Sequence, residues 1–207
     1  MATMIVPPAT VPPAVERTPR LAVLEDRRGT WAMILAIATE AALFLCLFSA
    51  YFYLAKGGWR WLAEDPPKLT LAIIMLIVLL ASSGVLFWGE QQAKANRPAL
   101  ARLSLVITIL MGLGFLVLSA FDYKHHLEKL TPRTDAYGSI FYTITTFHVA
   151  HLIVGLIMLA YVLLLPHIEP VNKPPHRPFH NASLYWHFVD VVWIFIVAFL
   201  YVAPNIR

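Results

Sequence analysis

Five acidic or histidine side chains lie inside long apolar stretches of this sequence, where an ionisable group needs a partner because lipid solvates charge poorly. They are Glu40, His148, His151, His187 and Asp190. A carboxyl group or an imidazole in such a place can hold a proton, bond a neighbouring helix, bind a lipid headgroup or ligate a metal. Their spacing and surroundings decide between these chemistries.

Glu40 lies about ten residues into the first apolar stretch, which is about 13 Å along a helix that rises 1.5 Å per residue. A carboxyl group at that depth has to be paired, hydrogen-bonded or protonated. Two interpretations stay open. Glu40 is either a protonated acid that bonds a neighbouring helix or a carboxylate linked to proton transfer or to a lipid headgroup.

His148 and His151 are three residues apart, so they share one face of a helix, and that face must point into the protein. With the nearby hydroxyl of Thr146, they predict an interhelical hydrogen-bond cluster. The alternative is a metal or haem site, to which Glu40 and His187 could add ligands. Two histidines with no third fixed ligand on the same segment are a weak signal for a metal, so we expect no metal site in this chain.

The last apolar stretch opens with Tyr185-Trp-His-Phe-Val-Asp-Val-Val-Trp193. His187 and Asp190 are again three residues apart, and a direct hydrogen bond between them would satisfy both groups. We interpret Tyr185, Trp186, His187, Asp190 and Trp193 as a structural lock for the last helix and as a subunit contact. A proton relay is the weaker alternative, because one pair near one face does not cross a membrane.

Composition defines the environment of these residues. The chain has 207 residues, of which 59% are hydrophobic and 14% charged, and its mean hydropathy is +0.67. Soluble domains carry about 25% charged residues, so this chain has too little polar surface for water on all sides. The net charge of +4 comes from Lys and Arg spread over the connecting segments, so no nucleic-acid partner is expected. The single cysteine, Cys46, excludes an intrachain disulfide.

A membrane-spanning helix needs about 20 apolar residues, and five stretches of the chain qualify. Strict alternation of apolar and polar residues is absent, which excludes a β-barrel. The fold class is therefore all-α, an integral membrane bundle of five transmembrane helices. The predicted spans are residues 31–55, 69–88, 99–121, 137–165 and 183–203.

The two ends flank this transmembrane domain. Residues 1–30 form a Pro-rich tail without the apolar core of a signal peptide, which predicts a disordered segment or one draped over a partner. Residues 204–207 form a short C-terminal tail. Nine Lys and Arg residues fall on the N-terminal side of the membrane and seven on the other, which favours a cytoplasmic N-terminus and a periplasmic or external C-terminus.

The string from Tyr185 to Trp193 resembles the signature of subunit III of haem-copper terminal oxidases. Three further motifs are similar to the same family, and together they extend the resemblance over nearly the whole chain. They are Glu40 followed by Leu43-Phe44 and Tyr51-Phe52, then Leu80-Ala-Ser-Ser-Gly84, and finally Tyr137-Gly-Ser-x-Phe141 with Phe147-His-x-x-His151-x-x-x-Gly155.

The resemblance implies a non-catalytic subunit of a respiratory oxidase in the bacterial inner membrane. Such a subunit carries no haem and no copper, which lie in partner subunits. It packs on catalytic subunit I, with subunit II and small subunits nearby, and holds phospholipids in a V-shaped helix cleft. Glu40 then matches the cleft carboxyl group, which is linked to lipid binding, proton uptake and stability during turnover. Cytochrome c or quinol donates electrons to the complex.

The sequence departs from the family in several places. Many members have seven spans, and here a Pro-rich tail replaces the first two, as in a short bacterial form. Gln91-Gln92 stand where the family often has two histidines, His180 stands where a glutamate is common, and Asp122 is one methylene shorter than the usual glutamate. The alternatives are a homologue associated with nitric oxide reductase and a small proton-linked transporter.

Overall fold

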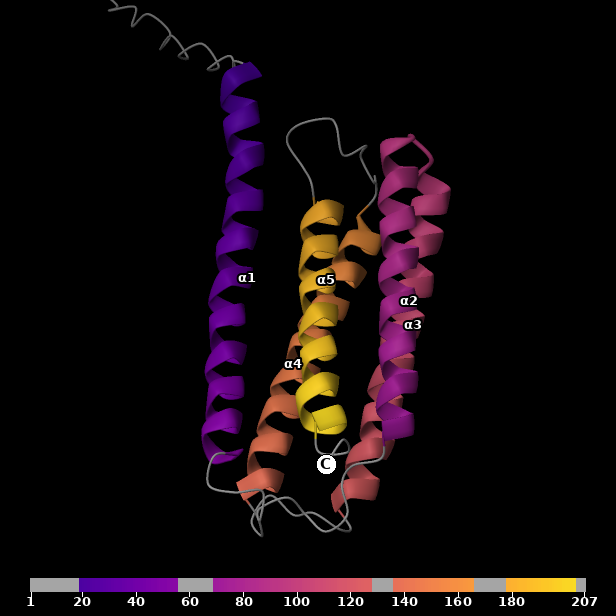
Figure 1. The fold of residues 1–207 in the computed structure, drawn as a ribbon. Coiled ribbons are helices and arrows are strands. Elements are labelled where there is room, and N and C mark those ends of the chain that lie inside the picture. Colours follow the sequence, from indigo (N-terminus) through magenta and orange to yellow (C-terminus); the bar gives the residue numbers. More distant parts are fainter. Residues whose placement is uncertain (1–18, 56–68, 128–135, 166–177, 204–207) are drawn as a thin grey trace, which may run out of the picture.

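The computed structural model describes residues 19–55, 69–127, 136–165 and 178–203. These residues form five long helices, each apolar and long enough to cross a membrane (Figure 1). The prediction of an all-α bundle with five spans is therefore confirmed, and the chain is a multi-pass membrane protein. The helices are α1 (Pro19–Ala55), α2 (Leu69–Lys94), α3 (Pro98–Leu127), α4 (Ala136–Leu164) and α5 (Pro178–Ile196), and α5 continues as the π-helical segment η2 (Val197–Val202).

Most helices extend beyond the predicted spans, because hydropathy detects the apolar stretch and not the polar turns at its ends. Three of them begin at a proline, namely Pro19, Pro98 and Pro178. Proline suits the first helical position, where its missing N–H would have no partner within the helix. Helix α1 begins at Pro19, within residues 1–30 that were predicted as a tail, and residues 1–18 lie outside the described residues.

A tight turn joins α2 to α3. Asn96 has a φ of 58°, the left-handed conformation that commonly ends a helix. The amide of Arg97 bonds the carbonyl of Gln92 at 2.9 Å and that of Asn96 bonds Ala93 at 3.1 Å, which satisfies carbonyls at the end of α2. Pro98 then starts α3 at once. The two helices run side by side as an antiparallel pair (Figure 1).

Helix α5 is the centre of the bundle. It contacts α1, α2 and α4, whereas α1 contacts chiefly α4 and α5 and stands on the far side from α2 and α3 (Figure 1). The C-terminal half of α1 is tied to η2 through the Tyr51 hydroxyl, which donates to the carbonyl of Phe199 at 2.7 Å. A π-helical segment shifts the regular hydrogen-bond pattern, which frees carbonyl groups for partners of this kind.

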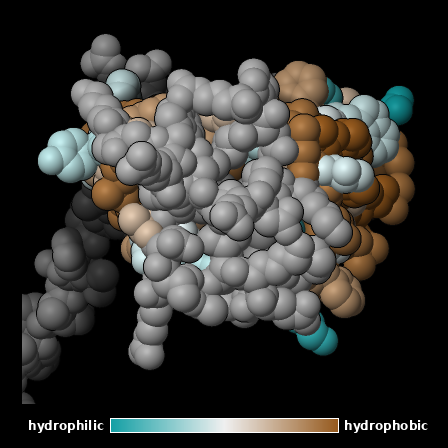
Figure 2. All heavy atoms as spheres, turned by 60° about the horizontal axis from the view of Figure 1, so that its bottom comes forward, coloured by the Kyte–Doolittle hydropathy of each residue, from teal (hydrophilic) through white to brown (hydrophobic). Residues whose placement is uncertain are grey.

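The outer face of the bundle is apolar, as lipid requires. Where Figure 2 shows described residues, the surface is largely hydrophobic, with few hydrophilic side chains. Large exposed side chains lie on every helix, for example Leu35 on α1, Ile77 on α2, Leu110 on α3, Ile157 on α4 and Phe195 on α5. The acidic and histidine side chains of the spans lie at contacts between helices, and their partners define the candidate site.

Candidate functional site

Glu40 of α1 and His151 of α4 form a pair across the helix interface. The Nε2 atom of His151 lies 2.9 Å from Oε2 of Glu40, and its Nδ1 atom lies 2.6 Å from the carbonyl oxygen of Phe147. The ring of Phe44 packs edge-on against the imidazole, with centroids 5.0 Å apart. The Glu40 side chain is 38% exposed and that of His151 is 12% exposed, so the carboxyl group can be reached from outside the bundle.

The hydrogen bonds of His151 determine how many protons this pair holds. A carbonyl oxygen cannot donate, so Nδ1 carries the hydrogen that bonds Phe147. The short contact between Nε2 and Glu40 then requires one further proton, which sits on the imidazole or on the carboxyl group. Either way the pair is neutral overall, which suits its position halfway along membrane helices. It holds one proton that two groups share.

The predicted cluster of His148, His151 and Thr146 stays a prediction, and in the structure the three side chains have different neighbours. His148 is fully buried and stacks on Trp193, with ring centroids 4.9 Å apart. Thr146 instead lies 3.3 Å from the hydroxyl of Tyr123 on α3. Three residues along a helix turn the side chain by about 60°, which is enough for His148 to face α5 and His151 to face α1.

His187 and Asp190 are linked through Ser83 of α2, where the sequence predicted a direct bond between them. The Ser83 hydroxyl donates to Oδ2 of Asp190, and its oxygen lies 2.8 Å from Nδ1 of His187. Because a hydroxyl has one hydrogen, Nδ1 of His187 must be the donor to Ser83. Its Nε2 atom then accepts from the hydroxyl of Ser183 at 3.2 Å. The four groups form one ordered chain that joins α5 to α2.

Trp186 packs where α5 meets α2, α3 and α4. Its side chain is fully buried, and its indole N–H donates to the hydroxyl of Ser82 at 3.0 Å. A Cβ atom at Gly112 of α3 would lie 2.7 Å from the ring, and one at Gly155 of α4 would lie 3.0 Å from it. The two glycines therefore make the space in which this indole joins three helices.

Tyr185, Trp186, Asp190 and Trp193 are all buried within the chain itself. That this string locks the last helix stays a prediction. The bonds of His187 and Asp190 to Ser83 and of Trp186 to Ser82 are compatible with it. A buried side chain does not touch a partner directly. Any effect of these four residues on subunit association therefore has to act through the fold of this chain.

A second polar contact between α2 and α5 was missed by the sequence analysis. Glu90 is 6% exposed, and its Oε1 atom accepts from Nδ1 of His180 and from Nζ of Lys94, each at 3.0 Å. The polar residues of α5 could have indicated this contact in the sequence. His180, Ser183, His187 and Asp190 follow one another at intervals of three and four residues. Such intervals place all four on one helix face, and Ser83 and Glu90 line the facing side of α2.

Removing the Ser83 hydroxyl is expected to loosen this interface. Ser83→Ala leaves His187 Nδ1–H and Asp190 without their shared partner, at a cost of about 1–3 kcal/mol. In the complex that the sequence motifs imply, we expect less of this chain to remain bound after a detergent wash, and the same for His187→Ala and Asp190→Ala. Ser49→Ala is the matched control, since that hydroxyl is exposed and bonds the carbonyl of Leu45 on its own helix. Equal retention in Ser83→Ala and Ser49→Ala would refute the lock.

In the described parts of the chain, no three histidine, cysteine or acidic side chains lie close enough to hold a metal ion together.

The family model described as cytochrome c oxidase subunit III matches residues 23–204. A protein named cytochrome c oxidase subunit 3 from Bacillus subtilis (strain 168) is 33% identical over 191 residues, covering 89% of this chain and 90% of the relative.

Similar proteins also occur outside that organism. The cytochrome c oxidase subunit 3 of Synechocystis sp. is 34% identical over 175 residues, covering 83% of this chain and 74% of the relative. The protein of that name from Drosophila yakuba is 31% identical over 180 residues, with 83% and 68% covered. These matches confirm the resemblance carried by the sequence motifs. This chain belongs to the cytochrome c oxidase subunit III family.

Proposed function

We propose that this chain is the non-catalytic subunit III of a respiratory haem-copper oxidase that reduces oxygen to water. It packs on catalytic subunit I, near subunit II and small subunits, in the bacterial inner membrane, with a cytoplasmic N-terminus and a periplasmic C-terminus. Haem and copper lie in those partner subunits, which receive electrons from cytochrome c or quinol. Family membership supports this role, as does a bacterial relative that matches over 90% of its length.

The pair of Glu40 and His151 is the observation that supports a specific task for this subunit. The pair is neutral while it holds the shared proton, and release of that proton leaves one negative charge on Glu40, whose side chain is partly exposed. Its position on the partly exposed side of α1 also places a polar group where a phospholipid headgroup or a partner helix could reach it. We therefore propose that Glu40 helps to hold phospholipid and to support proton uptake by the catalytic subunit.

Helix α1 offers the apolar surface that lipid tails need. Large side chains such as Leu35, Leu45 and Phe52 are exposed on α1, and exposed apolar surface of this kind mixes readily with acyl chains. Lipid at this face would lie between α1 and a neighbouring subunit.

Glu40→Gln is expected to impair lipid binding and proton uptake while leaving assembly of the complex unchanged. The amide can still donate a hydrogen bond to Nε2 of His151, but it cannot release the shared proton. We expect normal subunit content in the complex, fewer phospholipids per complex by mass spectrometry, and inactivation after fewer turnovers. Thr39→Ala is the control, because that hydroxyl is exposed and bonds the carbonyl of Ala36 on the same helix. If Glu40→Gln matched wild type in both lipid content and turnover lifetime, the proposed task would be wrong.

A further inference from the structure

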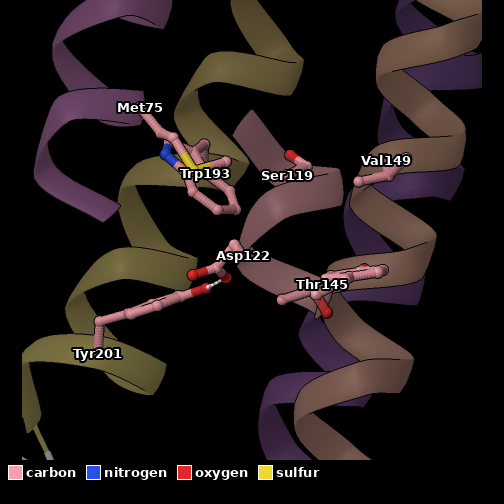
Figure 3. A pocket seen from close by; sticks show the side chains of 8 residues that line it. Met75, Ser119, Asp122, Thr145, Val149, Trp193 and Tyr201 are labelled. Atoms are coloured by element: carbon pink, nitrogen blue, oxygen red, sulfur yellow. Dashed lines mark hydrogen bonds between the residues drawn. The ribbon is translucent and has the colours of Figure 1, made fainter. Parts of the chain in front are cut away.

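Asp190 is a buried acid with little around it to stabilise a negative charge. The residue is 3% exposed, and its Oδ1 atom has no hydrogen-bond partner among the described residues. Its Oδ2 atom is bonded to the hydroxyl of Ser83. The other acidic side chains of the described spans are each bonded to a histidine, a lysine or a tyrosine: Glu40 to His151, Glu90 to His180 and Lys94, and Asp122 to Tyr201 (Figure 3).

A carboxylate at Asp190 would therefore be unfavourable. An ionised carboxyl group that is buried without a compensating charge is so costly that it binds a proton and becomes neutral instead. Within the described residues, no lysine or arginine forms an ion pair with Asp190. One hydroxyl donor leaves the second carboxylate oxygen bare. The neutral carboxyl group is the form that this position favours.

Three further side chains form a hydrogen-bonded path to this carboxyl group. Nε2 of His187 lies 3.2 Å from the hydroxyl of Ser183, and Nδ1 lies 2.8 Å from the hydroxyl of Ser83, which is bonded to Asp190. The bond directions given above are those of the ionised carboxyl group. Hydroxyl groups and imidazole rings can each donate and accept, so every bond of the path can reverse while the heavy atoms stay in place.

We propose that Asp190 is a proton-binding site at the end of this path and that its carboxyl group is protonated in the resting complex. Water at the start of α5, where the side chain of His180 is 27% exposed, supplies the proton. One proton binds Nε2 of His187, the proton on Nδ1 passes to Ser83, and the Ser83 hydroxyl hydrogen passes to Oδ2 of Asp190. These transfers add one proton to the carboxyl group and leave the imidazole neutral.

The protonated form accounts for the unpaired oxygen. Oδ2 of Asp190 then donates to Ser83, and Oδ1 is a neutral carbonyl oxygen, for which a missing donor costs less than for a charged group. Glu40 takes no part in this path, so the proton-binding site is independent of the proposed function.

The first test is infrared difference spectroscopy of the purified complex near neutral pH, with the wild type compared to Asp190→Asn. A protonated carboxyl group has a C=O stretching band above the amide bands, and a carboxylate has none there. We expect Asp190→Asn to lack one such band, which in the wild type shifts in heavy water. Glu40→Gln is the control and should keep this band, because Glu40 is bonded to His151 on other helices.

Identical spectra of the wild type and Asp190→Asn in this region would mean that Asp190 is ionised, and the proposal would be overturned. Should Asp190→Asn fail to assemble, Ser83→Ala gives the same decision. It removes the hydrogen-bond partner of the carboxyl group, so the band should change frequency, and an unchanged band would overturn the proposal.

The second test measures how fast the Asp190 band shifts after transfer to heavy water. Ser83→Ala removes the group between His187 and Asp190, so we expect the exchange to become several-fold slower. Ser49→Ala should exchange like the wild type, since that exposed hydroxyl bonds a carbonyl of its own helix. A loosened contact between α2 and α5 would speed the exchange, so an equal or faster rate in Ser83→Ala would overturn the path.

Discussion

Trp186→Ala is expected to lower the free energy of unfolding by about 3–5 kcal/mol, the usual range for removing a buried tryptophan. The indole is fully buried, fills the space beside Gly112 and Gly155, and donates to Ser82. Its removal leaves a cavity where α2, α3 and α4 meet α5, and it leaves the Ser82 oxygen without this donor. Denaturant titration of the complex in detergent, followed by circular dichroism and by subunit retention, measures the change.

Three further variants separate the parts of this effect. Trp186→Phe keeps most of the ring but loses the N–H, so we expect a smaller loss, with about 1 kcal/mol from the hydrogen bond. Gly112→Ala brings a methyl group to 2.7 Å from the indole, whereas Gly114→Ala on the same helix meets nothing within 4 Å. Equal stability of the Gly112 and Gly114 variants would show that the indole is not held between the helices as described.

Gly89→Ala is the second large effect, with an expected loss of about 1–3 kcal/mol from overpacking. A Cβ atom at Gly89 would lie 2.5 Å from Cβ of Ser104, which cannot move without its helix. It would also collide with the Ser104 hydroxyl, which is bonded to the carbonyl of Ala101. The α2–α3 pair must therefore separate, and the same titration should show reduced stability.

Gly84→Ala on α2 supplies the comparison, since a Cβ atom there meets nothing within 4 Å. Alanine is a better helix former than glycine by about 1 kcal/mol, so this variant should be neutral or slightly more stable. The difference between the two alanine variants isolates the contact with Ser104. A Gly89→Ala protein as stable as Gly84→Ala would mean that α2 and α3 are not packed this closely.

The five spans could be predicted from hydropathy because the length of an apolar stretch is a local property. The helix ends could not, since α1 begins at Pro19 and α2 continues to Lys94 through polar turns. The end of α2 is set by its cap, in which Asn96 is left-handed and the amides of Asn96 and Arg97 bond carbonyls of the last turn. A scan for apolar residues does not register such a cap.

Much of the candidate site depended on contacts between helices, which spacing within one helix does not reveal. The spacing of His187 and Asp190 indicated that both lie on one helix face, but the bridging Ser83 lies on another helix. Glu40 could be identified from the sequence as a carboxyl group in an apolar stretch. Its partner His151 could be identified only from the packing of α1 against α4. The family resemblance was readable because its motif string is contiguous.

Co-purification tests the central claim most directly. An affinity-tagged form of this chain, extracted from native membranes in mild detergent, should bring down a large subunit in equal amounts. That preparation should consume oxygen and show a haem absorption spectrum, and the spectrum should remain with the large subunit when this chain is stripped away. Stoichiometric haem on the separated chain would contradict the account, and so would ion flux through the chain alone in liposomes or a nitric-oxide-reducing partner in place of the oxidase.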